Sequence, residues 1–535
     1  MPLVACGVPE TGDPPPRDEM YFPVGLAAHP DGRYLYIANA GFDRRYNAGT
    51  LEVYDTWTRR VLSEATLTTG LFAGELVVSR FAQPSVRVTS PLRATVDGSI
   101  GTFELFVKNS GDGAADEVGV LLRLAGAASD ASCGDGDLFP GAVRGHQVRY
   151  RIPRLDAGTE IKLCGQFTCS GDACPPGAEN LSPELSLGGV PYIAPTGEPV
   201  KGARTIALLS TREDDRLTWF EIDRGKGDAP GHLVCSADGD ETCDESHRID
   251  ALGGVSNAPT LGPSPYGIAL DRTGFYLTHV KRGELSRWRF AGSETRPFEP
   301  EGICRLTLSG GASSVVRHPL LGWAYVSDRS GQAITTVATL DPLDRGLSGR
   351  LSSEKCRLEE RNPLIVDPDP GEGRTRGLAF SADGTVLYVA TGSDTSLHVY
   401  DTSIAANGRP RQLLLDAIPL GAGPNVVRVA GLRPGEVRAD TSLDGGAVGA
   451  AVDARGQGLV YISTFDSDEL LVVDPVLMAV VARVHTGSGP HEIAFLPDQD
   501  GHLQAWVANF RDHSLTLVDI DPDSPRRFTA VANLR

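Results

Sequence analysis

The sequence predicts an all-β protein, a seven-bladed β-propeller that carries an inserted Ig-like β-sandwich. Three observations predict this fold: a strand pattern that recurs along the chain, one interval between copies that is far too long, and few stretches that favour helix. Each copy is an apolar run ending in Gly-aliphatic-Ala, a turn, a Tyr- or Trp-rich strand, a polar turn and a further strand. Because one such unit cannot cover its own faces, several must stack around an axis.

The repeats begin at seven positions. They start at Gly25, Gly74, Gly267, Ser314, Gly377, Gly449 and Glu492. Within each copy, β-branched and aromatic residues alternate between Gly, Asp and Ser turns, as in short antiparallel strands. The last apolar segment, residues 528–534, is expected to form the outer strand of blade 7. The ring would then close by packing of sheet faces, without a strand borrowed from the N-terminus.

The interval between the second and third repeats is long enough to hold a separate domain. Removing one ordinary blade from it leaves about 145 residues, the size of a small domain. Alternating strands at 103–124 and 150–163, separated by Gly, Asp and Pro turns, predict a β-sandwich there. The expected organisation is a lipobox and Pro-rich tether (1–18), blade 1 with the start of blade 2 (19–84), the insert (85–195) and the remaining blades (196–535).

Charge and hydropathy narrow the classes of partner. The 535 residues carry a formal net charge of −19, and the basic residues are scattered. Such a surface opposes binding to nucleic acid or to anionic lipid, so neither is expected as a partner. No apolar run approaches the roughly 18 residues of a membrane span. A monomer that contacts a membrane only through a lipid anchor is expected.

The N-terminus contains a candidate lipidation site. The segment Leu3-Val4-Ala5-Cys6-Gly7 has the form of a lipobox, and a Pro-rich polar stretch follows it. This pattern predicts lipidation of Cys6 and a place in the bacterial cell envelope, as an outer-membrane or periplasmic lipoprotein. The alternative is a cytosolic N-terminus in which Cys6 has no role.

The remaining eight cysteines predict disulfides. They form sequence neighbours that suggest four bridges: Cys133 with Cys164, Cys169 with Cys174, Cys235 with Cys243, and Cys304 with Cys356. Eight cysteines permit 105 pairings, so other connectivities stay open. A zinc site is disfavoured because the spacing is not that of a Cys-x-x-Cys knuckle. Disulfides would place the chain in an oxidising compartment.

No cofactor is predicted. Calcium is a weak alternative at an acidic loop, where Asp238, Asp240 and Asp244 alternate as oxygen ligands would. The loop lacks the Gly and terminal Glu spacing of an EF-hand, and a solvated acidic turn explains it equally well.

Ligand-contacting residues are expected at the mouth of the central channel, where the inner strands of all blades converge. The residue before each repeat start forms a predicted ring: Val24, Ala73, Tyr266, Ser313, Arg376, Val448 and His491. Its polar members, Tyr266, Ser313, Arg376 and His491, are the candidate ligand-binding residues. His491, Glu492 and Arg376 are also the weaker candidates for an acid, base and electrostatic set. Hydrolase elbows, phosphate loops and zinc-protease motifs are absent from the sequence.

The tetrapeptides of the second strands resemble a known repeat family. They are Tyr36-Ile37-Ala38-Asn39, Tyr388-Val389-Ala390-Thr391, Tyr461-Ile462-Ser463-Thr464, Trp506-Val507-Ala508-Asn509 and Tyr325-Val326-Ser327-Asp328. They are similar to the surface-layer and periplasmic propeller family named for its Tyr-Val-Thr-Asn strand. The insert, with Asn-x-Gly-Asp-x-x-Ala and Ile-Pro-x-Leu-x-x-Gly, resembles the Ig-like CARDB-type modules of bacterial surface proteins.

These resemblances imply a fold and a location more than an activity. They imply a non-catalytic envelope propeller that binds a protein, peptide or glycan, with the insert as a spacer or second contact surface. The alternative is a hydrolase similar to the seven-bladed lactonases, with its site at the channel mouth.

Overall fold

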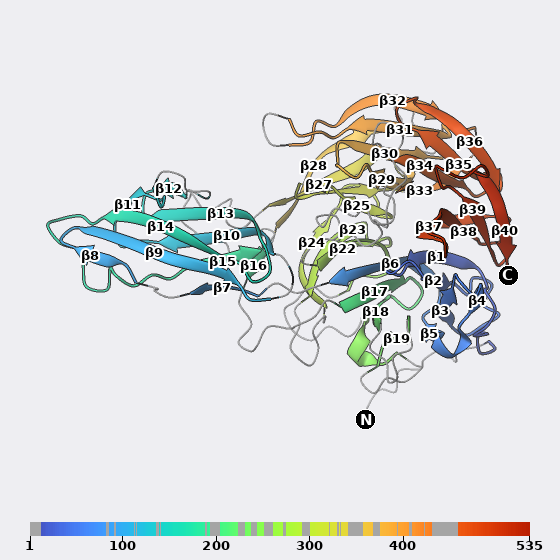
Figure 1. Ribbon diagram of the computed structural model, residues 1–535, viewed down its shortest axis with the longest axis horizontal. Helices are drawn as coiled ribbons and strands as arrows, with labels where there is room; N and C mark the ends of the chain where they lie inside the picture. Colours follow the sequence, from blue (N-terminus) through green and yellow to red (C-terminus); the bar gives the residue numbers. More distant parts are fainter. Residues whose placement is uncertain are drawn as a thin grey trace.

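In the computed structural model, seven antiparallel sheets surround a central channel and two further sheets form a lobe to one side (Figure 1). The structure describes residues 12–81, 85–89, 93–111, 113, 115–134, 139, 141–187, 190–192, 204–222, 231–236, 243–250, 261–270, 274–290, 300–319, 321–328, 331, 333–340, 357–366, 375–392, 394–405, 409–421, 423–430 and 458–535. None of the helices in these ranges is long and apolar enough to cross a membrane.

Each of the seven sheets is one propeller blade, and its strands run outward from the channel in chain order. Blades 1 and 2 contain β1 (Pro23–Ala28), β2 (Tyr34–Asn39), β3 (Gly49–Asp55), β4 (Arg60–Val61) and β5 (Leu67–Thr69), then β6 (Ala73–Phe81), β17 (Arg204–Thr211), β18 (Arg216–Ile222), β19 (Leu233–Val234) and β20 (Arg248–Asp250). Short 3-10 turns lie at η1 (Ser63–Ala65) and η2 (Glu245–His247).

Each of the other five blades has four strands among the described residues. Blades 3 to 5 contain β21 (Pro265–Leu270), β22 (Gly274–His279), β23 (Glu284–Phe290) and β24 (Pro300–Thr307); β25 (Val315–Arg317), β26 (Trp323–Ser327), β27 (Ala333–Leu340) and β28 (Arg357–Ile365); and β29 (Thr375–Phe380), β30 (Val386–Thr391), β31 (Ser396–Asp401) and β32 (Leu413–Pro419). Blades 6 and 7 contain β33 (Pro424–Ala430), β34 (Leu459–Thr464), β35 (Glu469–Asp474) and β36 (Ala479–His485), and β37 (Pro490–Pro497), β38 (Leu503–Asn509), β39 (Ser514–Asp519) and β40 (Thr529–Leu534).

Blade 6 corrects one prediction. Its inner strand is β33, which pairs with β34, whereas the sequence pattern placed that strand at Gly449. Gly449 and Val448 lie outside the described residues, and Asn425 of β33 takes the ring position that was predicted for Val448. The prediction was wrong because β33 lacks the Gly-aliphatic-Ala signature that marks β1, β21 and β29.

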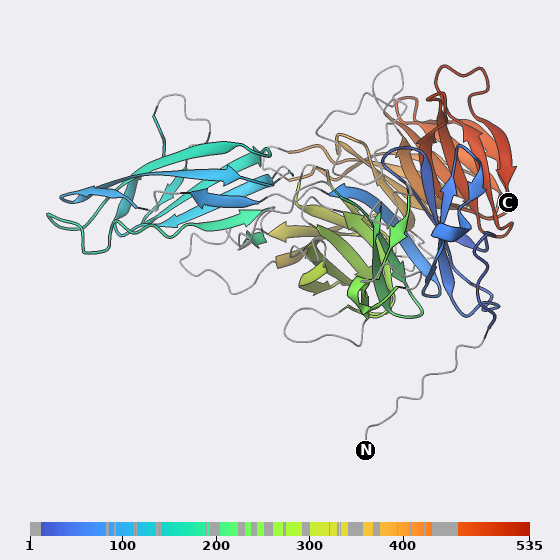
Figure 2. The same cartoon turned by 60° about the horizontal axis from the view of Figure 1, so that its bottom comes forward.

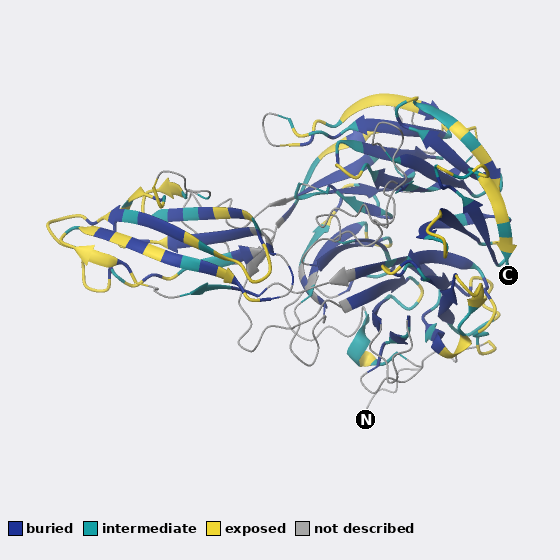
Figure 3. Ribbon diagram, viewed as in Figure 1, coloured by how far each residue is buried: buried dark blue, intermediate teal, exposed yellow. Residues whose placement is uncertain are grey.

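The hydrophobic core lies between neighbouring blades. The first residue of the repeated tetrapeptide is a large ring that is almost fully buried in six blades: Tyr36, Tyr276, Tyr325, Tyr388, Tyr461 and Trp506. Figure 3 shows the buried inner and middle strands and the more exposed outer strands β32, β36 and β40. Since strand faces in a propeller are covered only by the next blade, these rings hold adjacent sheets together.

Among the described strands, the ring closes between blades 1 and 7 without exchange of strands. Strand β40 pairs with β39 as the outer strand of blade 7, and blade 1 consists of strands from the N-terminal end alone. Trp506 packs edge-on against Tyr54 of blade 1, with ring centroids 5.7 Å apart. Closure therefore depends on face-to-face packing.

The insert leaves blade 2 between β6 and β17 and projects away from the propeller (Figure 2). One of its sheets contains β12 (Ala142–Arg144), β13 (Gln147–Leu155), β10 (Ala115–Arg123), β15 (Glu184–Leu187) and β16 (Val190–Tyr192). The other contains β11 (Ala127–Asp130), β14 (Glu160–Thr168), β9 (Ile100–Asn109), β7 (Val86–Thr89) and β8 (Thr95–Asp97). Strands of both sheets share one apolar core, as in a β-sandwich. The kinship with Ig-like modules stays a prediction.

Candidate functional site

A β-bulge begins the inner strand of most blades and turns the ring residues toward the channel. The pairing register of the inner strand shifts at Pro23, Pro265, Thr375, Pro424 and Pro490. After each shift, the next one or two residues are not in regular strand pairing. A bulge of this kind redirects their side chains. The residues so released include Val24, Tyr266, Arg376, Asn425 and His491.

The released side chains meet at a small cavity in the channel mouth. Its lining includes Val24, Glu75, Tyr266, Arg376, Asn425, Arg428, His491 and Glu492. The volume is about 40 Å³, which has room for a few water molecules and is far below the several hundred Å³ of ordinary small-molecule sites. Of the predicted ring, Val24, Tyr266, Arg376 and His491 line it. Ser313 does not, because its side chain is buried and donates to the carbonyl of Ser327 at 2.9 Å.

An ion triad occupies one side of this cavity. Arg428 Nη2 lies 2.9 Å from Glu492 Oε2 and 3.5 Å from Glu75 Oε1. Glu75 Oε2 also accepts from the backbone N–H of Ile268, at 2.9 Å. The triad thus connects the inner strands of blades 2, 3, 6 and 7 across the channel.

Burial shapes the charge state of the triad. Removal from bulk water raises the pKa of Glu75 to about 7, although the nearby Arg428 opposes the shift. Burial also raises the pKa of Glu492 against the same cation. For Arg428, burial favours the neutral form, but the two carboxylates outweigh it and hold its pKa above the usual value. The Arg428 side chain is 32% exposed and lines the cavity.

Glu75, Asn425 and Arg428 were not among the predicted site residues. The predicted ring contains one residue from each blade, whereas a bulge brings more than one side chain of a strand to the channel. A signal for β33 does exist in the chain. Pro stands two residues before the repeat start in Pro23-Val24-Gly25 and Pro265-Tyr266-Gly267, and Pro424 begins β33 in the same way.

Hydroxyl groups join neighbouring inner strands around the channel. Ser463 Oγ of blade 6 accepts from the N–H of Val426 in its own blade at 3.2 Å and donates to the carbonyl of His491 in blade 7 at 2.8 Å. The corresponding tetrapeptides of blades 2 and 3 are Leu208-Leu209-Ser210-Thr211 and Tyr276-Leu277-Thr278-His279. The third tetrapeptide residue makes the same two bonds in blades 2, 3 and 4, where it is Ser210, Thr278 and Ser327. In blades 1, 5 and 7 that position is alanine.

Seven rings gather on the face of the propeller where the inner strands begin. They form what we call the aromatic surface: Phe22, Phe42, Phe72, Phe465, His491, Phe510 and His513. Phe510 is central to it, with centroids 5.1 Å from Phe22, 5.4 Å from Phe42 and 5.8 Å from Phe465. His491 lies 6.4 Å from Phe510 and also lines the channel cavity, so the two features are continuous.

Three rings of this surface, Phe22, Phe72 and His513, have backbone φ angles in the left-handed region, which disfavours bulky residues. Phe22 and Phe72, the residues before β1 and β6, have φ of 48° and 53°. The equivalent residue before β37 is Gly489, with φ of 68°, and glycine adopts this region without a steric penalty. A bulky residue at positive φ costs on the order of 1–3 kcal/mol, and such residues cluster at functional sites.

Cations and carboxylates border the aromatic surface in pairs. Arg511 lies 4.4 Å from the Phe465 ring centroid, and its Nη2 is 3.1 Å from Asp466 Oδ1. Arg44 lies 5.6 Å from the Phe72 centroid, and its Nη2 is 2.8 Å from Glu213 Oε1. Each guanidinium therefore stacks on a ring while a carboxylate balances its charge.

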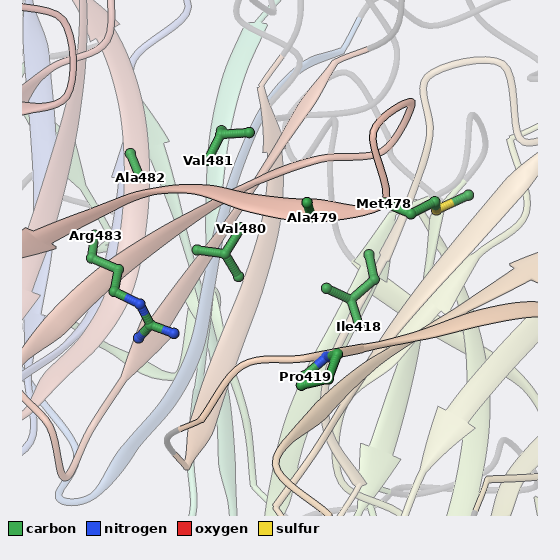
Figure 4. A pocket seen from close by; sticks show the side chains of 8 residues that line it. All are labelled: Ile418, Pro419, Met478, Ala479, Val480, Val481, Ala482 and Arg483. Atoms are coloured by element: carbon green, nitrogen blue, oxygen red, sulfur yellow. The ribbon is translucent and has the colours of Figure 1, made fainter.

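A larger hollow lies on the rim of the propeller, away from the channel. It has a volume of about 590 Å³ and lies between the outer strands of blades 5 and 6 (Figure 4). Its lining is Ile418, Pro419 and residues 478–483, which are aliphatic apart from Arg483. Arg483 donates to the carbonyl of Leu420 and pairs with Glu469. The groove offers no acid and base set for chemistry.

The predicted cysteine pairs are present as far as the structure describes them. Disulfides join Cys133 with Cys164, Cys169 with Cys174 and Cys235 with Cys243. Cys304 is disulfide-bonded, and its predicted partner, Cys356, lies outside the described residues. Cys6 also lies outside them.

The candidate calcium loop falls largely outside the described residues, which exclude Asp238 and Asp240. Asp244 caps η2 by accepting from the N–H of Ser246 at 2.8 Å. Elsewhere in the described ranges, Asp498, Asp500 and His502 lie close enough to share an ion. Asp498 accepts the N–H groups of the other two at 2.9 Å each, so the group is explained as a turn.

Comparison with known proteins gives structural likeness alone. No protein family model matches the chain, and no curated protein matches it. Among solved structures, the Pseudomonas aeruginosa periplasmic gluconolactonase PpgL is 15% identical with a TM-score of 0.38, covering 78% of this chain and 96% of its own.

Two further solved structures are similar at lower identity. A functionally unknown protein from Desulfotomaculum acetoxidans is 11% identical with a TM-score of 0.39, covering 62% of this chain and 81% of its own. The Cps50 (Swd1) β-propeller domain of Myceliophteria thermophila is 9% identical with a TM-score of 0.37, covering 62% and 83%. Likeness at this level supports no conclusion about activity.

Proposed function

We propose that the protein is a non-catalytic binding module of the bacterial cell envelope, whose ligand docks on the propeller face around the channel mouth. In this proposal the chain is a monomeric propeller of the Tyr-Val-Thr-Asn type, anchored through a lipid on Cys6. The Ig-like insert acts as a spacer or second contact surface. The ligand is a protein, peptide or glycan, and nucleic acid is not a partner.

The observation that carries the proposal is the state of the channel mouth. Its cavity of about 40 Å³ is too small for a sugar-sized substrate. Glu492, the carboxylate next to His491, is held by Arg428 at 2.9 Å. A ligand therefore has to rest outside the channel, on the aromatic surface that adjoins it.

The alternative, a lactonase, is supported by one observation: His491, Glu492 and Arg376 all line the same cavity. Hydrolysis of glucono-δ-lactone by the wild type and by His491→Ala would test it. We expect no turnover above the uncatalysed rate from either protein. Turnover by the wild type that is lost in His491→Ala would favour the lactonase and overturn the binding proposal.

A direct test of binding uses the full chain immobilised on a biosensor. A detergent-free extract of bacterial envelopes is passed over the wild type, Phe42→Ala, Phe510→Ala and the control Trp57→Ala. Trp57 is also an exposed ring beneath an arginine, Arg33 at 4.8 Å, but it follows β3 at the opposite end of the strand from Phe42.

We expect the signal to fall in the two Phe variants and to persist in Trp57→Ala. Equal signals from all four proteins, or none from the wild type, would overturn the proposed site.

A further inference from the structure

The charge pattern of the aromatic surface restricts what can bind there. The two guanidinium groups beside its rings are each balanced by a carboxylate, Arg44 by Glu213 and Arg511 by Asp466. The whole chain carries a net charge of −19. Since neither the local pairs nor the overall field attract anions, the surface suits a ligand without anionic groups.

The shape of the surface points away from peptide recognition. Extended peptides add to a sheet edge, helical peptides lie in an apolar groove, and Pro-rich peptides dock in an aromatic-lined groove. The rings here come from loops and strand starts of blades 6, 7, 1 and 2, and they are not part of a sheet edge. The adjoining cavity has room for a few waters, so it offers no pocket for an anchoring side chain.

The surface combines the two kinds of contact that a sugar ring requires. Phe42 is 55% exposed and offers an apolar face against which the C–H face of a pyranose can stack. At the edges, each ion pair places guanidinium donors beside carboxylate acceptors, and both kinds of group are needed to bind vicinal hydroxyls. The strained positions of Phe22 and Phe72 keep two further rings in the same layer.

We infer that the aromatic surface binds a neutral oligosaccharide, with Phe42 and Phe510 as stacking residues and the Arg44–Glu213 and Arg511–Asp466 pairs as hydroxyl-binding groups. This inference rests on the proposed binding function and names the ligand class for the same face. His491 lies at the inner edge of the surface, where the sugar chain meets the channel mouth.

The test is calorimetric titration of the full chain with single probes. The neutral probes are cellohexaose, xylohexaose, mannohexaose and chitohexaose, and the anionic probe is hexagalacturonic acid. We expect at least one neutral probe to bind, with an affinity that changes little between low and high salt. The anionic probe should bind more weakly. Phe42→Ala and Phe510→Ala should each lower the affinity about tenfold, a loss typical of a central aromatic contact.

Controls separate a lost contact from a lost fold. Trp57→Ala should bind as the wild type does, and the thermal midpoint of the exposed-residue variant Phe42→Ala should be unchanged. If no neutral probe binds, or if Phe42→Ala and Phe510→Ala bind as tightly as Trp57→Ala, the inference is wrong. Protease treatment of the envelope extract distinguishes failure of the oligosaccharide inference from failure of the proposed binding function. A biosensor signal that depends on Phe42 but disappears after proteolysis would overturn the glycan and leave the binding function standing.

Discussion

Blades 2, 3, 4 and 6 differ from blades 1, 5 and 7 at a single repeated position, the third residue of the tetrapeptide. In the first group, a Ser or Thr hydroxyl accepts a hydrogen bond from a backbone N–H of its own blade and donates one to a backbone carbonyl of the next blade's inner strand. Ser210, for example, accepts from Glu75 N–H and donates to the Tyr266 carbonyl. In the second group the residues are Ala38, Ala390 and Ala508. One repeat pattern therefore supports two kinds of junction, one hydrogen-bonded at the channel and one that depends on packing alone at this position.

The largest loss of stability is expected at the contact between blades 7 and 1, where the third tetrapeptide residue of both blades is alanine. Trp506→Ala removes a ring that is 1% exposed and packs against Tyr54 of blade 1. The cavity should lower the free energy of unfolding by about 3–5 kcal/mol. Tyr388→Ala in blade 5, whose third tetrapeptide residue is also alanine, should cost a similar amount. Thermal and urea denaturation measure both, with Trp57→Ala as the exposed control. An unchanged midpoint would contradict the dependence on packing.

Blades 1 and 7, which both have alanine as the third tetrapeptide residue, differ in the third strand, at the residue opposite the second tetrapeptide residue. In blade 7, Asn509 donates to the hydroxyl of Thr516 at 2.9 Å. In blade 1 the equivalent of Thr516 is Glu52, opposite Ile37 as Thr516 is opposite Val507. Glu52 is 0% exposed, and Asn39 nearby opposes the effect of burial on its charge state. Burial raises its pKa to about 8.

Replacing Glu52 should therefore change how stability depends on pH. An unfolded Glu titrates near 4.3, so the folded state retains a proton that the unfolded state loses between about pH 4.5 and 8. Stability that is fully present below that window is lost as pH rises through it. Glu52→Gln removes this loss, and its stability relative to the wild type should increase from pH 5 to pH 8 by on the order of 3 kcal/mol.

The difference between the two proteins isolates Glu52, because Glu75, whose pKa is about 7, titrates in both. Urea denaturation at several pH values gives the curve. A wild-type and a variant curve that stay parallel would mean that Glu52 is ionised in the folded protein.

The sequence was sufficient for the blade count because each blade repeats an alternation that only stacking can satisfy. It failed at β33, where Pro424 and Asn425 begin an inner strand without the repeated Gly-aliphatic-Ala. It found Tyr266, Arg376 and His491 at the channel but not Glu75 or Arg428, since bulges bring side chains to the channel that one aligned position per blade misses.

The aromatic surface could not be predicted from local patterns. Phe22 and Phe42 lie near one end of the chain, and Phe465 and Phe510 lie near the other. They meet only because the ring closes between blades 1 and 7, and closure is a property of the whole fold. A loop phenylalanine has no periodic signal, and the strain at Phe22 becomes visible only as a backbone angle.

The smallest effect should come from converting one kind of junction into the other. Ser463→Ala gives blade 6 the residue that blades 5 and 7 have, and it removes the bonds to Val426 N and His491 O. Losing a buried hydrogen-bonding partner costs about 1–3 kcal/mol, which is less than the loss of a buried ring. Thr278→Val should do the same between blades 3 and 4, whereas Thr278→Ser keeps the hydroxyl and should stay within about 1 kcal/mol of the wild type. If Ser463→Ala were as stable as the wild type, packing alone would hold both kinds of junction, and the distinction between the two groups of blades would have no energetic meaning.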